Sequence, residues 1–489
     1  MQIYVINPYQ TSEPHFPIIG MVSDYYSYLW NVQLYGLGYF ELTVAATSAN
    51  INLLKVGRFL VRECDIRKND PSDTYPEYKN AMIIRTATIV YDAEQGHLLQ
   101  VTGKSVKDIL SQRIIWEPFE WADSELNAVL LHLIDANVAS PTNYSGNEKR
   151  MASDALTGAQ NAKNAAQTTY NNARSDYNTS KAAYETSKAT YDASMAAYEE
   201  AVNQYGQDSP EAKAAKDTMD WDKVQMEMDE NTMQQTETTM NEKKVILDAA
   251  VADLAEAQAK YDYYAWFDSV SALREIPYVN VNIIELPSSP EVTIQLYGEN
   301  LGTWAETICE EYGIGWTFYL DETGLKFQFI EGTDKSSTVI FSEDLDNLKN
   351  AEYNEDLLIY KNAGLATGEG EGFHQVVADI GSASGKSRYE EFISTGLTKS
   401  ETTTAANYKK QVKQYGQSEI TKSSKYKTIS GEIDTDGVFK IDQDFTLGDI
   451  VKVQMMRGIE ATTKLIEIIY SDETDGIRTT GTFQEWEVS

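Results

Sequence analysis

A tyrosine recurs every seven residues in the middle of this chain, and this repeat limits the fold more than any other feature. The tyrosines are Tyr170, Tyr177, Tyr184, Tyr191, Tyr198 and Tyr205. Three residues after each of the first five comes a small residue: Ala173, Ser180, Ser187, Ser194 and Ala201. A spacing of seven that divides into three and four is typical of a coiled-coil seam. Residues 147–264 are also rich in helix-forming residues, so the repeat lies on a long helix.

A second heptad follows downstream and supplies a partner for the first. Its members are Met219, Met226, Met233, Met240, Leu247, Leu254 and Tyr261. In the connecting stretch YGQDSPE, Gly206 suits a helix C-terminus, Ser209 suits an N-cap and Pro210 suits the first helical position. A chain that folds back here places Tyr198 opposite Met219, and every further pair follows in the same register. The sequence therefore predicts an antiparallel coiled-coil hairpin, roughly 70–80 Å long at ~1.5 Å per residue.

Tyrosine suits such a seam, because its ring packs on methionine while its hydroxyl group reaches water. The alternative interpretation is a parallel coiled coil that forms only between separate chains. The hairpin is favoured, because two independent heptads that share one fold-back register are difficult to obtain by chance.

Both flanks of the hairpin have the pattern of β-structure with a few helices. Short runs rich in Val, Ile, Tyr, Phe and Thr predict strands before the hairpin, and helices are expected near Ser105 and across SELNAVLLHLIDAN. After Trp266, YGENLGTWAETICEEYG predicts a helix and WTFYLDETGLKFQFI predicts a β-hairpin that turns at residues 321–324. Residues 366–400 predict only weak strands, and the segment from Gly431 onward predicts a small β-barrel or sheet.

The charge of the chain argues against several classes of partner. Its 41 Lys and Arg residues stand against 75 Asp and Glu residues, a net charge of -34. A nucleic-acid-binding surface needs clustered cations, and so does docking on anionic lipid. The start MQIYVINPYQ does not resemble a signal peptide, and no apolar run approaches the ~18 residues of a membrane span. We therefore expect a soluble protein made in a reducing cytoplasm, without specific nucleic-acid binding or membrane insertion.

Residues capable of catalysis or metal binding do not form recognisable motifs. The two cysteines, Cys64 and Cys309, form no CxxC or Cys/His cluster, so neither a zinc site nor a disulfide framework is expected. The four histidines, each interpreted as a packed or surface residue, are His15, His97, His132 and His374. Motifs of serine hydrolases, zinc proteases and Cys–His nucleophiles are absent. The sequence therefore predicts no catalytic, cofactor-binding or metal-binding residues, and no cofactor.

Three glycine- or aspartate-rich stretches are interpreted as turns. GLATGEGEGF lacks the Lys and Ser/Thr of a phosphate loop, and Glu369 and Glu371 would repel a phosphate. The sequences at residues 434–437 and 472–476 resemble fragments of calcium loops but lack the closing glutamate.

Several sequence blocks outside the hairpin resemble one family of phage proteins, the siphophage tail-tip or baseplate-hub group of the ReqiPepy type. The blocks include SYLWNVQLYGLGYFEL, LLQVTGKSVKDILSQRII, REIPYV, VIFSEDLDNLKNAEYNED and LGDIVKV. The residues that carry the resemblance are Trp30, Gly38, Phe40, Glu41, Leu42, Gly103, Leu110, Arg113, Ile114, Arg274, Pro277, Phe341, Ser342, Asn347, Leu348, Leu465 and Ile466. The blocks keep the order of the family, whereas the helical hairpin is a departure from it.

The resemblance implies an α+β, mostly β chain, with two barrel-like tube domains interrupted by the hairpin. The expected domains are a first hub domain at 1–145, the hairpin at 146–265, a second hub domain at 266–400 and a C-terminal small β-barrel at 401–489. Similarity to the myophage baseplate hub implies a non-enzymatic homotrimeric ring in the virion tail, assembled in the host cytoplasm, through which DNA passes. Expected partners are neighbouring tail proteins, such as distal tail, tip or fibre proteins. Acidic residues would face the passage or simply aid solubility.

Two other functions remain as alternatives. A tail-associated cell-wall hydrolase would usually carry an added peptidase or muramidase domain. A coiled-coil adhesin would need an export signal or an anchor. Neither mark is recognised in the sequence, so the structural hub is favoured.

Overall fold

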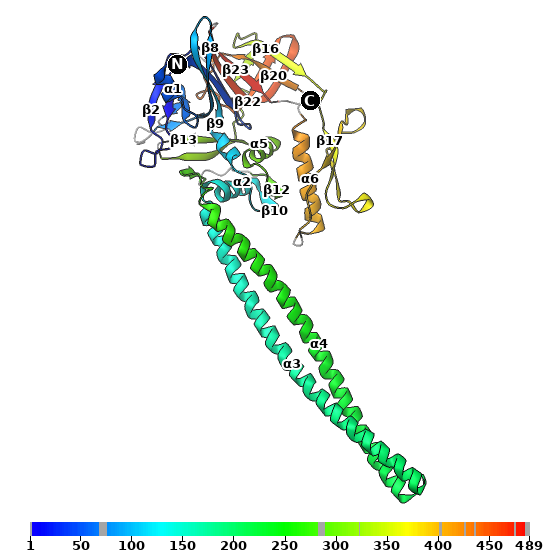
Figure 1. The fold of residues 1–489 in the computed structure, drawn as a ribbon. Helices are drawn as coiled ribbons and strands as arrows, with labels where there is room; N and C mark the ends of the chain where they lie inside the picture. The colour runs from blue at the N-terminus through cyan, green and yellow to red at the C-terminus, as the bar shows by residue number, and fades with distance from the viewer. Residues whose placement is uncertain are drawn as a thin grey trace. The chain divides into compact units, whose positions relative to one another are not determined.

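The structure is a computed structural model that describes residues 2–67, 76–281, 289–321, 323–400, 403–424, 427–434, 437–473 and 476–484. The chain divides into two compact units (Figure 1). One comprises Met1–Pro141 together with Arg274–Ser489, and the other comprises Thr142–Leu273. Helices account for 42% and strands for 32% of the structure, with the long helices flanked by β-rich parts. The predicted α+β class with an inserted helical hairpin is therefore confirmed.

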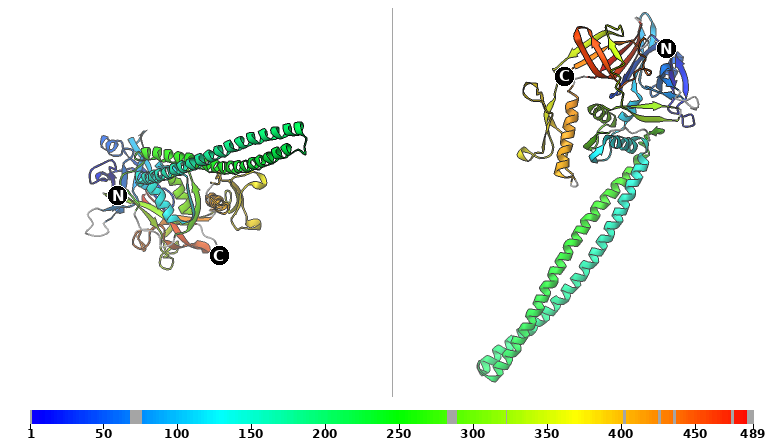
Figure 2. Two further views of the ribbon diagram at one scale, coloured as in Figure 1. Left: turned by 90° about the horizontal axis from the view of Figure 1, so that it is seen from below. Right: turned by 180° about the vertical axis from the view of Figure 1, so that it is seen from behind.

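The inserted unit consists of two helices, α3 (Pro141–Tyr205) and α4 (Pro210–Ser271). They run side by side in all views (Figure 2). At the turn, Gly206 has a φ of +86° and the Ser209 side chain accepts a hydrogen bond from the Ala212 amide at 3.0 Å, as an N-cap does. The fold-back lies where the sequence predicts it, and both helices extend slightly beyond the expected 146–265.

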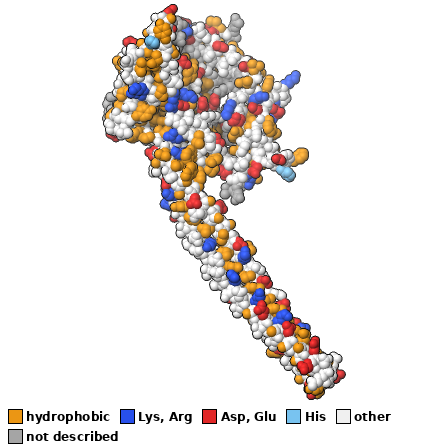
Figure 3. Space-filling model, viewed as in Figure 1, with side chains coloured by type: hydrophobic (Ala, Val, Ile, Leu, Met, Phe, Trp, Pro, Cys, Tyr) orange, Lys and Arg blue, Asp and Glu red, His pale blue; other side chains and the backbone are white. Residues whose placement is uncertain are grey.

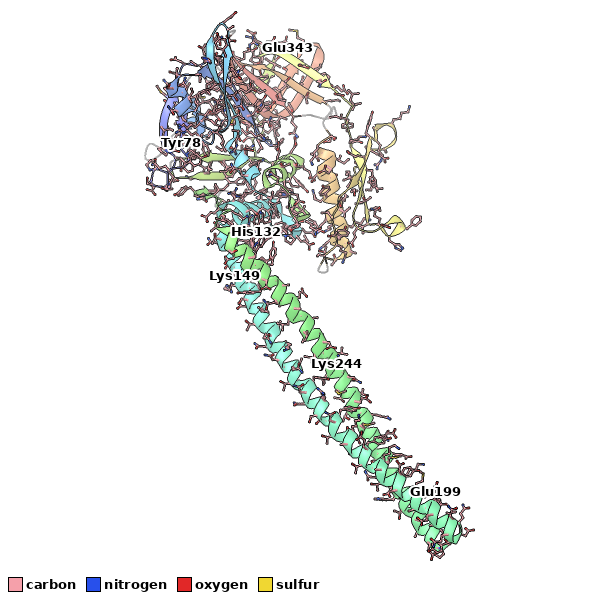
Figure 4. The ribbon with its side chains drawn as sticks, viewed as in Figure 1. Tyr78, His132, Lys149, Glu199, Lys244 and Glu343 are labelled. Carbon is pink, nitrogen blue, oxygen red and sulfur yellow. The ribbon has the colours of Figure 1, made fainter. Side chains whose placement is uncertain are left out.

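Contacts between the two helices agree with the predicted register. The tyrosine and methionine heptads lie along the less exposed faces, apart from Tyr205 at the tip, while most other positions are exposed. The hydroxyl groups of Ser180 and Thr236 lie 2.6 Å apart across the pair. Nearer the base, Lys149 Nζ donates to Asp268 Oδ2 at 2.8 Å (Figure 4). The partner of the tyrosine seam thus comes from the same chain.

The other unit is built on a 13-stranded sheet to which both ends of the chain contribute. The main path is ordered β16-β20-β23-β22-β3-β4-β9-β8-β5-β1-β2, and β21 joins β22 and β15 beside it. The strands are β1 (Ile3–Ile6), β2 (Ile18–Val22), β3 (Ser27–Gln33), β4 (Tyr39–Ala45), β5 (Phe59–Arg62), β8 (Met82–Asp92), β9 (Gly96–Ser105), β15 (Ile340–Ser342), β16 (Leu348–Glu355), β20 (Lys427–Ile433), β21 (Ile450–Met455), β22 (Ile459–Glu473) and β23 (Gly476–Phe483).

The antiparallel pair β3–β22 joins the N-terminal and C-terminal segments, with Trp30 opposite Tyr470. Tyr470 packs against two hydrophobic cores, one around Trp30 and Phe40 and the other around Phe341 and Phe483. The strands expected as a C-terminal barrel therefore lie in the large sheet, and no closed barrel is detected in the described part of the chain. The division of the flanks into three separate domains stays a prediction.

Smaller sheets and helices complete this unit. A five-stranded sheet runs β11 (Val279–Asn280), β14 (Leu325–Ile330), β13 (Gly315–Leu320), β7 (Glu77–Tyr78) and β6 (Ile66–Arg67). Its β13–β14 pair is the predicted hairpin, with Phe318 opposite Phe327. Strands β10 (Phe119–Glu125) and β12 (Glu291–Leu296) form a separate pair. The helices here are α1 (Ser48–Leu53), α2 (Leu126–Ile134) and α5 (Leu301–Glu311), and the helix expected near Ser105 is a 3₁₀ segment, η2 (Val106–Gln112).

A small module is inserted between β16 and β20. It contains a three-stranded sheet, β18 (Val377–Ile380), β17 (Ala363–Thr367) and β19 (Glu390–Ser394), and the helix α6 (Ala405–Thr421). Tyr408 and Val412 of α6 pack on Ala366 and Ile380 of the sheet. None of the described helices combines the length and the apolar character that a bilayer-spanning segment needs.

Candidate functional site

The histidines and cysteines lie apart from one another. His15 stacks on Tyr278 with ring centroids 3.7 Å apart, and the His132 ring lies edge-on to Phe119 and Trp121. The other members of the set are placed as follows: His97 is on β9, His374 is in the 3₁₀ turn Gly372–His374, Cys64 is exposed and Cys309 is buried. Within the described ranges, no group of three or more His, Cys, Asp or Glu side chains could hold a metal ion.

The glycine-rich stretch forms a turn between β17 and β18. Gly370 and Gly372 have φ angles of +107° and +56°, which favour glycine. The Glu369 amide donates to the Tyr408 hydroxyl oxygen at 2.6 Å, and the Glu369 carboxylate accepts from the Lys399 amide at 3.0 Å. These contacts tie the turn to its own module. Of the two aspartate-rich turns, residues 435–436 and 474–475 lie outside the described part.

Residues that carry the family resemblance are mostly structural. The Arg113 guanidinium donates to the Arg274 carbonyl at 2.7 Å, and the Arg274 guanidinium donates to Asn137 Oδ1 at 2.6 Å and lies over the Trp116 ring. Asn347 accepts from the Ser342 amide at 2.7 Å, which holds the start of β16 beside β15. Trp30, Phe40, Phe341, Leu348 and Leu465 are core residues. These residues of the resemblance therefore serve the interior of the fold.

A buried lysine holds the segment that follows β3. Lys107 of η2 is 3% exposed, and its ammonium group donates to the carbonyls of Gln33, Leu34 and Gly36 at 2.9, 3.1 and 2.7 Å. The same group lies 4.6 Å from the centroid of the Trp316 ring. These contacts, called here the cage around Lys107, connect the segment after β3 of the large sheet with β13. Sequence patterns gave no indication of it, because a buried lysine and a surface lysine look alike in the sequence.

Three described strands of the large sheet have a single neighbour: β2 pairs with β1 alone, β16 with β20 alone and β15 with β21 alone. The two at the ends of the main strand order, β2 and β16, differ in character. β2 has the sequence IIGMV, and Ile18, Ile19 and Met21 are 40%, 41% and 51% exposed. β16 instead presents charged side chains. A register shift interrupts the pairing of both strands, between Lys349 and Glu352 on β16 and opposite Val5 and Ile6 on β2. Charged side chains protect an edge strand against pairing with another chain, so β2, which has none, is less protected than β16.

The module between β16 and β20 is fixed to α5 through a partly buried carboxyl group. Glu311 accepts hydrogen bonds from Gln414 Nε2 at 2.6 Å and from Ser418 Oγ at 2.5 Å. Burial raises the pKa of Glu311 from 4.5 to about 7, although both hydrogen bonds act in the opposite direction. The folded protein therefore holds this proton more tightly than the unfolded chain does.

We expect Glu311→Gln to abolish a pH dependence of stability. Because the folded pKa is raised, the contribution of the protonated Glu311 is present below pH 4.5 and is lost as pH rises through 7. At pH 8 the variant should be more stable than the wild type by about 2 kcal/mol, allowing for partial exposure, and at pH 5 the two should differ little. Melting temperatures measured from pH 5 to 8 check this. Glu94→Gln is the matched control, because Glu94 is exposed. Melting temperatures that change with pH in parallel for the wild type and both variants would contradict the prediction.

The model of the family described as Siphovirus ReqiPepy6 Gp37-like protein matches residues 3–198 and 229–483. The match covers much of both hairpin helices and leaves out only residues 199–228 of the hairpin, around the turn, so the expectation that the whole hairpin departs from the family is wrong. The search of curated proteins gives no match.

Solved structures resemble the chain over most of its length. One is a 43 kDa tail protein of prophage MuSo2 from Shewanella oneidensis, with 10% identity, a TM-score of 0.45, and coverage of 99% of this chain and 98% of that one. Another is a tail protein from Neisseria meningitidis MC58, with 9% identity, a TM-score of 0.42, and coverage of 99% and 96%. A third is the E. coli c3393 protein, a type VI secretion component, with 7% identity, a TM-score of 0.36, and coverage of 95% and 74%.

Proposed function

The chain belongs to the Siphovirus ReqiPepy6 Gp37-like protein family, and from this premise we propose that three copies form a hub ring at the tip of a phage tail. As a member of this family it is a structural component of the virion tail. In the proposed ring it connects the tail tube with the host-facing tip, lets DNA pass and catalyses no reaction. The contacts are with copies of itself and with neighbouring tail proteins.

The observation that carries the proposal is the open large sheet. Its strands β2 and β16 lie at opposite ends of the main strand order and do not pair with each other in the described residues. Two different surfaces on one molecule allow head-to-tail contacts, and such contacts close into a ring when the rotation between copies permits. The apolar β2 edge is the better candidate for an inter-chain contact, because it lacks charged side chains.

The net charge of -34 is consistent with a passage for DNA. Carboxylates that face the passage would repel phosphate groups and keep the DNA from binding. Solubility alone explains the same charge, so the charge supports the proposal less than the sheet edges do.

The helical hairpin is proposed as a contact for neighbouring tail proteins. Lys and Asp or Glu side chains alternate along it (Figure 3), and several form pairs four residues apart, such as Lys244 with Asp248. On α4, Trp221, Val224 and Met228 are 72%, 53% and 59% exposed. Their spacing of three and four places them on one face of the helix, away from the methionine seam. An apolar group of this kind on a charged helix suits contact with another protein.

Measurement of the native mass of the purified protein tests the proposal. Three copies are expected for the full chain, and also for a chain in which a glycine linker replaces residues 142–273. The deletion is feasible because the Ile276 amide donates to the Val138 carbonyl at 2.8 Å, which places the two ends side by side. A single copy in both proteins would contradict the ring. Lysis of cell walls in a zymogram would contradict the non-enzymatic role.

A further inference from the structure

A cavity lies between β12, α5 and α6, where the inserted module meets the rest of its unit. Its volume is about 270 Å³. Trp304 of α5, Tyr415 of α6 and Leu397 contribute aromatic and apolar walls. Pockets for drug-sized ligands measure ~300–1,000 Å³, so this cavity suits something as small as one amino-acid side chain.

Two carboxamide oxygens of residues that line this cavity lack partners among the described residues. Gln411 is only 2% exposed, and its Oε1 atom is buried without a hydrogen-bond partner among the described residues. Gln295 Oε1, on the facing strand β12, is also buried without a hydrogen-bond partner among the described residues. Gln414, one turn further along α6, differs: its Nε2 donates to Glu311 and its Oε1 accepts from the Tyr312 hydroxyl group at 3.0 Å. Buried polar groups are rarely left unsatisfied, so the orphaned oxygens indicate a missing donor.

The charges around the cavity favour a positively charged donor. Lys422 and Glu419 both line it, and they pair with each other at 2.7 Å. Glu299 has no cation beside it among the ion pairs of the described residues. Its Oε2 atom accepts from the Tyr297 amide at 2.6 Å. Burial raises the pKa of Glu299, as expected for a carboxyl group in a partly dry site that lacks a positive neighbour. Acceptors and one unbalanced carboxyl group therefore converge on the same space.

We propose that this cavity binds the ammonium or guanidinium end of a Lys or Arg side chain from a neighbouring tail protein. The Gln295 and Gln411 oxygens accept hydrogen bonds from the cation, Glu299 balances its charge, and Trp304 and Tyr415 enclose its alkyl stem. Aromatic side chains also attract cations through their ring faces. The identity of the partner rests on the proposed function, whereas the chemistry of the site does not. An anion is disfavoured, because it would meet the Gln295 and Gln411 oxygens and the Glu299 carboxyl group, while Lys422 is already paired with Glu419.

The test uses the full chain and three small probes: butylguanidinium chloride, butylammonium chloride and the neutral butanol. Tryptophan is replaced by 5-fluorotryptophan, and the ¹⁹F signal of Trp304, assigned with Trp304→Phe, is followed as each probe is added. We expect both cations to shift this signal and butanol to leave it unchanged. Gln411→Leu should weaken cation binding by about tenfold or more, because a hydrogen bond to a charged group is lost. Gln417→Leu, on the same helix but outside the cavity, should bind as the wild type does.

Three results would overturn the proposal: butanol binding as tightly as the cations, equal affinity in Gln411→Leu and wild type, or no shift with any probe, which would mean a cavity that holds water only. Melting temperatures of the two glutamine variants show whether both are folded, and Gln295→Leu replaces Gln411→Leu if the latter is not. The native mass of the same samples separates the two proposals. Three copies without cation binding would reject the site alone, and one copy with cation binding would reject the ring alone.

Discussion

A chain that carries Ile19→Lys and Met21→Lys on β2 is expected to be a folded monomer. In the proposed ring these side chains lie at an inter-chain contact. In the single chain Ile19 and Met21 are substantially exposed, at 41% and 51%. A lysine on an edge strand prevents pairing with another chain, because its charge would have to be desolvated. The association should weaken by at least about 100-fold, which converts the protein to single copies at micromolar concentration. Native mass and sedimentation measure the change.

The matched control is Val251→Lys on α4, which places the same charge on another exposed apolar residue. It should leave the copy number unchanged, because the hairpin is not expected to hold the ring together. The circular dichroism spectrum and melting temperature of the β2 variant should match those of the wild type, since β2 already exposes these side chains. A β2 variant that still forms trimers would place the inter-chain contact elsewhere.

The hairpin could be predicted from the sequence because its rules are local. Each seam residue lies three or four positions from the next, and the turn residues Gly206, Ser209 and Pro210 have the conformations that favour these amino acids. The β13–β14 hairpin is similar, since strict alternation and a short connection determine its register.

Helix α6 escaped prediction because its buried face is not apolar enough to be recognised. That face includes Gln411 and Gly416 beside Tyr408, Val412 and Ile420. Glycine fits there because the helix approaches the sheet closely: a Cβ atom at Gly416 would lie 2.6 Å from that of Ala366. A pattern based on hydrophobic periodicity cannot identify a helix that packs through a glycine and a glutamine.

The pairing of β3 with β22 is a property of the whole chain and not of either segment. Each strand is recognisable by its own pattern, yet the partners Trp30 and Tyr470 are far apart in sequence. The cavity at Gln411 and the cage around Lys107 have the same origin. Glutamine and lysine are common on protein surfaces. Gln411 and Lys107 are buried only because segments far apart in the sequence pack over them. The family could be identified from the sequence because the segments that resemble it contain core residues and follow one another in the order of the family.

Replacing Lys107 by methionine should lower the free energy of unfolding by about 1–3 kcal/mol, because buried carbonyls lose a donor. Burial lowers the pKa of Lys107 to about 7, so the lost interaction is smaller than that of a fully charged lysine. Methionine fills a similar volume but donates no hydrogen bond, so the carbonyls of Gln33, Leu34 and Gly36 lose their shared donor. Contact of the charge with the Trp316 ring is lost as well. Neither loss is repaired by water, because the site is buried. Urea unfolding followed by tryptophan fluorescence measures the difference.

Lys104→Met is the control for this substitution, because Lys104 lies nearby on β9 with a side chain that is 53% exposed. Its ammonium group is 4.0 Å from Asp108, a distance at which an exposed pair contributes little. The control should change the unfolding free energy by no more than about 0.5 kcal/mol. If the two variants unfolded at the same urea concentration, the segment after β3 would be held by its backbone pairing with β4 and β22 and not by the lysine. A loss confined to Lys107→Met would instead show that this side chain adds to the hydrogen bonds that Trp316 of β13 already donates to the Leu34 and Tyr35 carbonyls.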